Sequence, residues 1–345
     1  MGDGFNVYSA RPPLSPPPRP HAGGVLPEIR PDPKNRKPEN PMNHATTLPF
    51  DLPLPEPGRA VLIAGPTASG KSALALAIAR AQGRVIVNAD ALQVHDSWSL
   101  LSARPGPGDL AQAPHHLYGH VPRGAEYSVG HWVRELAPLL ERHPDAVIVG
   151  GTGLYFSALT EGLARIPETP PQIRAEADAL LREAGLAAML AGLDAATLGR
   201  IDQQNPARVQ RAWEVLRATG RGLAAWQQET GAPLLPLEST TALVLTPNRD
   251  WLAARITQRF AAMLRDGALE EARAALPHWP EDAGHSTAPL WTRAIGAAEL
   301  VAHLRGQMSL AEAEAAATLA TRQYAKRQRS WFRNRMAQWK SLPLP

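Results

Sequence analysis

The sequence predicts an α/β fold in which a helical domain is inserted into a parallel-sheet core. Three observations predict it. Short, wholly apolar runs typical of buried parallel strands recur along the chain, and the first of them leads into a glycine-rich turn and a helical pattern. The stretch from about 167 to 237 shows helical periodicity alone. The 345 residues also exceed the roughly 250–300 at which a single core stops growing, so more than one domain is expected.

The composition excludes several classes of protein. Hydrophobic residues make up 44% and charged residues 20% of the chain, the proportions of an ordinary globular protein. No apolar run approaches the roughly 20 residues that span a bilayer, and no signal-peptide pattern opens the chain. The absence of cysteine excludes disulfides, thiolate-bound zinc, iron–sulfur clusters and a cysteine nucleophile. We expect a cytoplasmic protein without a membrane partner, acting as a monomer.

Residues 1–57 predict a disordered, proline-rich leader. They contain 15 of the 34 prolines and show neither helical nor strand periodicity. One interpretation is a polyproline ligand for a partner; the other is a dispensable extension, with Met42 as a candidate true start. Beyond the leader we expect a P-loop catalytic core made of residues 58–166 and 241–340. The helical insertion domain is expected at residues 167–240.

The first strand, residues 60–64, leads into the most specific single motif of the chain. The pattern G-x-x-x-x-G-K-[ST] is satisfied by Gly65, Pro66, Thr67, Ala68, Ser69, Gly70, Lys71 and Ser72. A helical pattern follows at residues 72–81. The glycines let backbone N–H groups converge on phosphate oxygens, Lys71 adds positive charge, and the Ser72 hydroxyl is a ligand for Mg²⁺. This P-loop predicts a diphosphate or triphosphate ligand, which need not be a nucleotide.

Two further strands end in residues suited to chemistry. Residues 85–87 are followed by Asn88, Ala89 and Asp90, and an aspartate at this strand end of a P-loop fold faces the phosphate site. Asp90 is therefore a candidate magnesium ligand, general base or helix N-cap. Residues 146–149 are followed by a glycine-rich segment at 150–153 that includes Thr152. Its glycines permit either the close approach of a ligand or a tight turn.

The rest of the chain predicts one more strand and a basic end. Residues 242–245 form another apolar run, and amphipathic helices are expected from 251 to 339. His115 and His116 are expected to be structural, because adjacent side chains point in different directions. The net charge is +4, yet residues 321–340 carry seven Lys/Arg and no acid, which predicts a polyanionic partner. Aromatic residues accompany these cations and suit nucleic-acid contact, although core packing is the expected role for the aromatics taken alone: Tyr324, Trp331, Phe332 and Trp339.

The chain resembles the bacterial tRNA dimethylallyltransferases, also called tRNA isopentenyltransferases. The resemblance runs from about residue 61 to 335 and rests on nine ordered motifs. Besides the P-loop they lie at residues 88–94, 103–105, 114–117, 127–130, 149–155, 205–212, 255–260 and 321–328. Ala91 stands where serine is commoner and His95 where tyrosine is commoner. Family members bind the diphosphate of dimethylallyl diphosphate in the P-loop and transfer the prenyl group to N6 of the adenosine just 3′ of the anticodon.

The resemblance implies a set of site residues. Asp90 matches the general base, Thr67 matches a threonine beside the reacting centre, and Arg259 matches an arginine that meets the diphosphate. Contact with the anticodon arm of tRNA is expected for Asp90, Ala91, Leu92, Gln93, Thr152, Arg174, Arg208, Val209, Gln210, Arg211, Arg293 and Arg327. Mg²⁺ held by Ser72 is the expected cofactor, and ATP binding at the P-loop stays open.

Other functions fit part of the pattern. A small-molecule kinase, or a prenyltransferase acting on free adenylate, would explain the P-loop and Asp90 but neither the helical insertion nor the basic C-terminal segment. An RNA-binding NTPase that acts as a chaperone or switch would require hydrolysis of a nucleotide. We therefore predict an α/β protein, a P-loop parallel-sheet core with a helical insertion domain, that acts as a magnesium-dependent tRNA dimethylallyltransferase.

Overall fold

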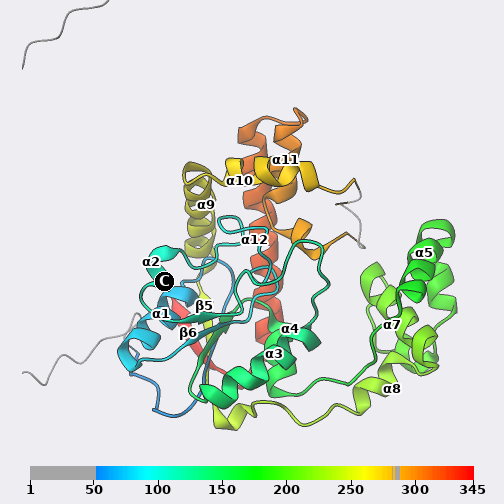
Figure 1. Cartoon of the computed structure of the whole chain (residues 1–345), viewed down its shortest axis with the longest axis horizontal. Coiled ribbons are helices and arrows are strands. Elements are labelled where there is room, and N and C mark those ends of the chain that lie inside the picture. The colour runs from blue at the N-terminus through cyan, green and yellow to red at the C-terminus, as the bar shows by residue number, and fades with distance from the viewer. Residues whose placement is uncertain (1–51, 282, 284–287) are drawn as a thin grey trace, which may run out of the picture. The chain divides into compact units, whose positions relative to one another are not determined.

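The centre of the protein is a six-stranded, wholly parallel sheet in the order β3-β2-β4-β1-β5-β6 (Figure 1). The computed structural model describes residues 52–281, 283 and 288–345, so residues 1–51 of the expected leader lie outside it. The strands are β1 Val61–Ala64, β2 Ile86–Asn88, β3 His115–His116, β4 Val147–Gly150, β5 Thr241–Pro247 and β6 Lys340–Leu344. The predicted α/β parallel-sheet fold is confirmed.

Helices cover both faces of this sheet because side chains alternate along each strand. From β1, Val61 and Ile63 pack with Leu74 and Ile78 of α1 (Lys71–Gln82), whereas Leu62 points into the other face. That second face is covered by α3 (Val129–Arg142), α4 (Gly153–Thr160) and the end of α12 (Leu310–Arg335). The strands β1 and β4 are buried along their whole length, which explains their uninterrupted apolar sequences.

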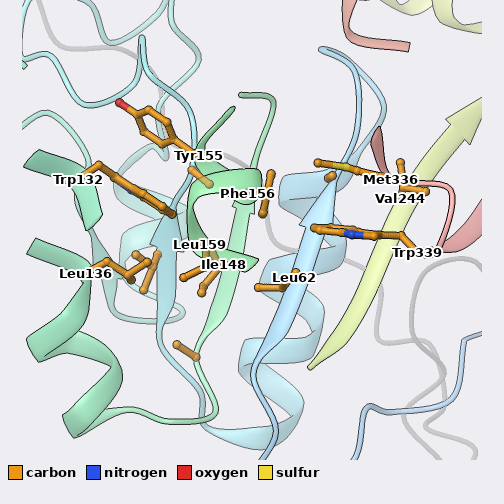
Figure 2. Close-up of a cluster of buried hydrophobic side chains, with 14 of the residues drawn as sticks. Leu62, Trp132, Leu136, Ile148, Tyr155, Phe156, Leu159, Val244, Met336 and Trp339 are labelled. Carbon is orange, nitrogen blue, oxygen red and sulfur yellow. The ribbon is translucent and has the colours of Figure 1, made fainter. Parts of the chain in front are cut away.

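Aromatic side chains dominate the core between the sheet and α3, α4 and α12. Trp132 is fully buried, stacks on Tyr155 at 4.6 Å between ring centroids, and donates its indole N–H to the Asn88 carbonyl at 2.7 Å (Figure 2). Phe156 contacts Trp339 edge to face at 5.2 Å. Trp339 and Phe332 thus pack in the core, which is the role expected for these aromatic residues when considered by themselves.

The stretch between α4 and β5 contains α5 Pro171–Ala191, α6 Ala195–Leu198, α7 Pro206–Thr219 and α8 Leu223–Gln228. The helices α5 and α7, drawn in green in Figure 1, pack around Ala177, Met189 and Val209. The chain segments that enter and leave this helical group run side by side. Ala164 and Thr230 form an antiparallel bridge, and the Leu235 N–H donates to the Leu159 carbonyl at 3.1 Å.

The remaining helices are α2 Pro107–Leu110, α9 Arg249–Arg265, α10 Ala268–Ala275 and α11 Ala297–Leu304. The last three pack with the N-terminal half of α12 around Trp98, Phe260 and Trp291. Within the described residues, no helix is long and apolar enough to cross a membrane.

Two boundaries differ from the sequence-based expectation. The strand β6 pairs with β5 beyond residue 340, the expected end of the core. Its Pro343 argues against a central strand, but β6 lies at the sheet edge, where a missing N–H is tolerated. Residues 52–57, assigned to the leader, contact the core: Arg84 donates to the Glu56 carbonyl and Gln82 to the Pro55 carbonyl, each at 2.8 Å. Apolar periodicity could not reveal contacts made through backbone carbonyls.

Candidate active site

The carboxyl ends of β1, β2 and β4 bring three loops to one edge of the sheet. These strands are neighbours in the order β2-β4-β1, so the segments that follow them must meet. The P-loop follows β1, Asp90 follows β2, and Gly151 and Thr152 follow β4. Thr152 donates its N–H to the Ala89 carbonyl at 3.2 Å and so joins the last two loops directly.

The P-loop surrounds the N-terminus of α1 and borders an open cavity of about 400 Å³. Gly70 adopts φ 90°, a left-handed conformation that favours glycine, immediately before the 12-residue helix. The cavity is lined by Ala68, Gly70, Lys71, Ser72, Ala103, Arg255, Gln258 and Arg259. Its walls therefore combine a helix N-terminus with three cations and no carboxylate, which is an environment for a strongly negative ligand.

Lys71 and Arg259 are held in this site at an electrostatic cost. Burial lowers the pKa of the Lys71 ammonium from 10.5 to about 8, the charge of Asp90 opposes this shift, and Arg259 adds to it. Burial also lowers the pKa of Arg259, again opposed by Asp90. The three groups thus interact with one another. An anionic ligand would supply the negative charge that the two cations lack.

Thr67 lies where the P-loop meets α9 and α12. Its hydroxyl accepts a hydrogen bond from Nη1 of Arg259 at 3.4 Å, and its backbone N–H donates to Oε1 of Gln328 at 2.9 Å. Arg255, one turn before Arg259 on α9, donates from Nε to the Ala68 carbonyl at 3.0 Å. The structure therefore brings the expected residues Thr67 and Arg259 together and adds Arg255 to them.

Asp90 has one carboxylate oxygen engaged in a turn. Oδ1 accepts the Leu92 N–H at 3.0 Å, while the backbone N–H of Asp90 donates to Oδ1 of Asn88 at 2.9 Å. Residues 91–94 form a turn and no helix follows, so the helix-cap interpretation is wrong. Oδ2 faces Gly151, since a Cβ built on that glycine would lie 3.1 Å from it. Oδ1 is thus engaged by the turn, while Oδ2 lies beside the glycine-rich loop.

The charge of Asp90 acts on three tyrosines. Burial raises the pKa values of Tyr118, Tyr155 and Tyr324, and the negative charge of Asp90 raises them further. The three phenols therefore remain protonated at neutral pH. They come from the loop after β3, from α4 and from α12.

Several residues expected to contact tRNA near Asp90 make hydrogen bonds within the protein. The Ala91 N–H donates to the Thr152 hydroxyl at 2.9 Å. Gln93 donates its amide to the carbonyls of Ser102 and Ala103, at 2.9 and 3.1 Å. His95, which replaces the commoner tyrosine, is buried, and burial lowers its pKa. These contacts orient the loop backbone and hold the side chain of Gln93 within the protein.

The expected tRNA contacts in the helical group differ in their exposure. Arg174 pairs with Glu126 at 2.6 Å and Arg208 with Asp202 at 3.7 Å, and both arginines are exposed or half-buried. Val209 is fully buried, and Gln210 is buried while donating to Asp178 at 2.7 Å. The side chains of Val209 and Gln210 therefore face the interior of the protein, and their contact with tRNA stays a prediction. They lie on the inner side of α7, whereas Arg208, from the same motif at residues 205–212, lies on its exposed side.

The other expected contacts are divided between α7, a 3₁₀ turn and α12. Arg211 donates to the Thr169 hydroxyl at 2.5 Å and lies 3.7 Å from Glu214. Arg293 ends the 3₁₀ turn Leu290–Arg293 and is exposed. Arg327 is exposed on α12, with its guanidinium 5.8 Å from the Tyr324 ring centroid.

Sequence reasoning did not single out Gln328. It lies on the buried side of α12 with Ala325 and Phe332, three residues before and four residues after it, and its amide joins two loops of the site. The sequence could have indicated it, because a glutamine whose neighbours on the same side of a helix are apolar must form hydrogen bonds in the interior.

Family models match most of the chain. The model described as IPP transferase matches residues 93–335, and the one described as Isopentenyl transferase matches residues 58–118. The chain is 65% identical over 294 residues to the tRNA dimethylallyltransferase of Cereibacter sphaeroides (strain ATCC 17025 / ATH 2.4.3), covering 85% of this chain and 99% of that protein. It is 61% identical to the tRNA dimethylallyltransferase of Jannaschia sp. (strain CCS1), covering 84% and 97%.

Solved structures agree with this similarity. The tRNA isopentenylpyrophosphate transferase of Bacillus halodurans shares 26% identity and a TM-score of 0.58, over 83% of this chain and 90% of that one. A eukaryotic dimethylallyltransferase acting on tRNA has a TM-score of 0.70 at 23% identity, over 82% and 73%, and supports the fold.

Proposed function

This chain belongs to the tRNA dimethylallyltransferase family, and from that premise we propose its reaction. It transfers a dimethylallyl group from dimethylallyl diphosphate to N6 of the adenosine 3′-adjacent to the anticodon in tRNA, and it releases diphosphate. The observation that carries the proposal is the convergence, at one sheet edge, of a cationic P-loop site and the carboxylate of Asp90.

The diphosphate is proposed to bind at the P-loop. Departure of this group breaks the C1–O bond and leaves the bonding electrons on the diphosphate, so negative charge grows on that oxygen. Lys71 and Arg259 lie where they would neutralise it, and Arg259 also orients the Thr67 hydroxyl by its 3.4 Å contact. Groups that meet the charge as it develops stabilise the transition state more than the ground state.

Asp90 is proposed as the base for the acceptor. The lone pair of adenine N6 is delocalised into the ring, so the C1–N6 bond forms readily only if an N6 proton leaves as the bond forms. Oδ2 of Asp90, beside Gly151, is the oxygen available to take that proton, because Oδ1 already accepts from Leu92. General-base catalysis of this kind is worth roughly 10²–10⁴ in rate.

The proposed metal is Mg²⁺, with Ser72 as its protein ligand. Ser72 lines the cavity beside the P-loop. Among the residues that the structure describes, no group of three or more His, Cys, Asp or Glu side chains could hold a metal ion. One hydroxyl together with diphosphate oxygens and water is the kind of coordination that Mg²⁺ favours. Such an ion would add positive charge at the leaving group.

The tRNA is proposed to meet the chain through its anticodon arm. We assign it to the exposed cations of α12, to Arg293, and to Arg174, Arg208 and Arg211 of an insertion domain at residues 167–240. Burial, together with the neighbouring charges of Arg249 and Arg333, lowers the pKa of Arg329, as expected where cations cluster without acids. Such a cluster attracts a phosphate backbone. We propose that a monomer carries the whole site and acts in the cytoplasm.

The test is prenyl transfer to a defined RNA. Purified protein is incubated with radiolabelled dimethylallyl diphosphate, Mg²⁺ and an anticodon stem-loop that has adenosine at the position 3′ of the anticodon. We expect label in that nucleoside, released as N6-dimethylallyladenosine on digestion. A matched RNA with guanosine at this position, and a parallel assay for phosphate release from ATP, are the controls. Phosphate release from ATP without prenyl transfer would contradict the proposal and support an RNA-binding NTPase.

A further inference from the structure

Gln328 connects the two halves of the site. On one side its Oε1 accepts the backbone N–H of Thr67, in the P-loop after β1, at 2.9 Å. On the other side its Nε2 donates to the carbonyl of Gly151, in the loop after β4, also at 2.9 Å. The residue is only 5% exposed. A single carboxamide thus satisfies one donor and one acceptor that belong to different loops.

Each loop is in turn bonded to a group that we assign to the reaction. Thr67 carries the hydroxyl that contacts Arg259 on the donor side. Gly151 precedes Thr152, whose hydroxyl accepts the Ala91 N–H and so fixes the segment that begins with Asp90. Gly151 itself lies between the amide of Gln328 and the carboxylate of Asp90, with no space for a Cβ. A shift of the Gln328 amide would therefore change the position of Thr67 relative to Asp90.

We propose that Gln328 is a positioning residue that sets the distance between the diphosphate leaving group and the base, and that it does so through both of its hydrogen bonds. This inference rests on the proposed dimethylallyl transfer. A misplacement of about 1 Å between reacting groups costs on the order of 10²-fold in rate, whereas binding of each substrate depends on contacts that Gln328 does not make. Its removal should therefore lower the rate of transfer and leave the affinity for each substrate unchanged.

Two variants of Gln328 separate positioning from structural support. Gln328→Leu keeps the volume but removes both hydrogen bonds. Gln328→Glu keeps an acceptor for Thr67 but, when ionised, cannot donate to Gly151. Thr318→Val is the matched control, because Thr318 is a buried polar residue of the same helix, 10 residues earlier and so about 15 Å along the axis.

The measurement is the single-turnover rate constant for prenyl transfer, with donor and tRNA saturating, together with the dissociation constant of each substrate and the melting temperature. We expect both Gln328 variants to lose 10- to 100-fold in rate, with dissociation constants within threefold of wild type, and Thr318→Val to keep its rate. Lower melting temperatures with unchanged rate constants for the folded variants would overturn the proposal. A wild-type protein that transfers no prenyl group would instead overturn the proposed function.

A pH series supplies a readout that structural support would not give. A protonated glutamic acid has a carbonyl acceptor and an O–H donor, like the carboxamide, and burial beside Asp90 favours that form. The rate of Gln328→Glu relative to wild type should therefore rise several-fold from pH 8 to pH 6, whereas the relative rate of Gln328→Leu should stay constant. A ratio for Gln328→Glu that stays flat, or falls toward pH 6, would overturn the role of the two hydrogen bonds.

Discussion

The lowered pKa of Lys71 predicts that donor binding takes up a proton. In the free protein burial lowers this pKa from 10.5 to about 8. A bound diphosphate would favour the ammonium form and raise the pKa again. Affinity for the donor should therefore be highest below pH 8 and should fall as the pH rises through that value. Folding without ligand has the opposite pH dependence. The unfolded chain holds this proton more tightly than the folded protein does, so the free energy of unfolding rises with pH between about 8 and 10.5.

The size of the effect follows from the pKa. At pH 9, one unit above the value of about 8, roughly nine in ten free molecules carry a neutral Lys71. If the bound ammonium stays protonated, the dissociation constant should be about tenfold higher at pH 9 than at pH 7. This corresponds to about 1.4 kcal/mol of binding free energy.

The assay is calorimetric titration with an unreactive thiolodiphosphate analogue of the donor at pH 7, 8 and 9. Buffers of different ionisation enthalpy report the proton uptake directly. Lys71→Met keeps most of the side-chain length and removes the titrating group, so it should bind more weakly and lose the pH dependence that is specific to Lys71. Equal pH profiles for wild type and Lys71→Met, or no proton uptake by the wild type near pH 8, would refute the reasoning.

Further substitutions test other parts of the molecule. Arg327→Ala combined with Arg329→Ala should raise the apparent KM for tRNA and reduce the slope of log affinity against log salt by about one unit per lost phosphate contact, with donor binding unchanged. An unchanged salt slope would place the RNA elsewhere. Gly151→Ala should lower the transfer rate at least tenfold, because its Cβ would meet the amide of Gln328 and lie 3.1 Å from Oδ2 of Asp90; a wild-type rate would show that the two loops have room to move. Leu62→Ala, at a fully buried position of β1, should lower the free energy of unfolding by about 2–5 kcal/mol in denaturant titrations, and a loss below about 1 kcal/mol would mean that the core collapses around it.

Much of the sheet and its edge could be predicted from local sequence. The P-loop pattern and the apolar runs at β1 and β4 each depend on a few adjacent residues, because buried parallel strands are apolar throughout and phosphate loops need glycine. Asp90 could be placed for the same reason, because it lies two residues after the end of β2.

Features that depend on distant residues were harder to predict. Gln328 is 261 positions from Thr67 and 177 from Gly151, so no local pattern indicates that it bonds to both. The sequence also did not predict which residues of one motif are exposed. Val209 is buried on α7, although its neighbour Arg208 in the same motif is exposed. Which side of a helix is buried depends on its packing partner, here α5.

The rate of Asp90→Asn tests the proposed chemistry most directly. Asparagine keeps the shape of the side chain and one acceptor oxygen for the Leu92 N–H, but it does not take the N6 proton. With donor and tRNA saturating, the single-turnover rate constant should fall by roughly 10²–10⁴ at every magnesium concentration, while both dissociation constants stay within a few fold. A rate that rising magnesium restores would make Asp90 a metal ligand, and a rate close to wild type would remove it from the reaction; either result would contradict its assignment as the base.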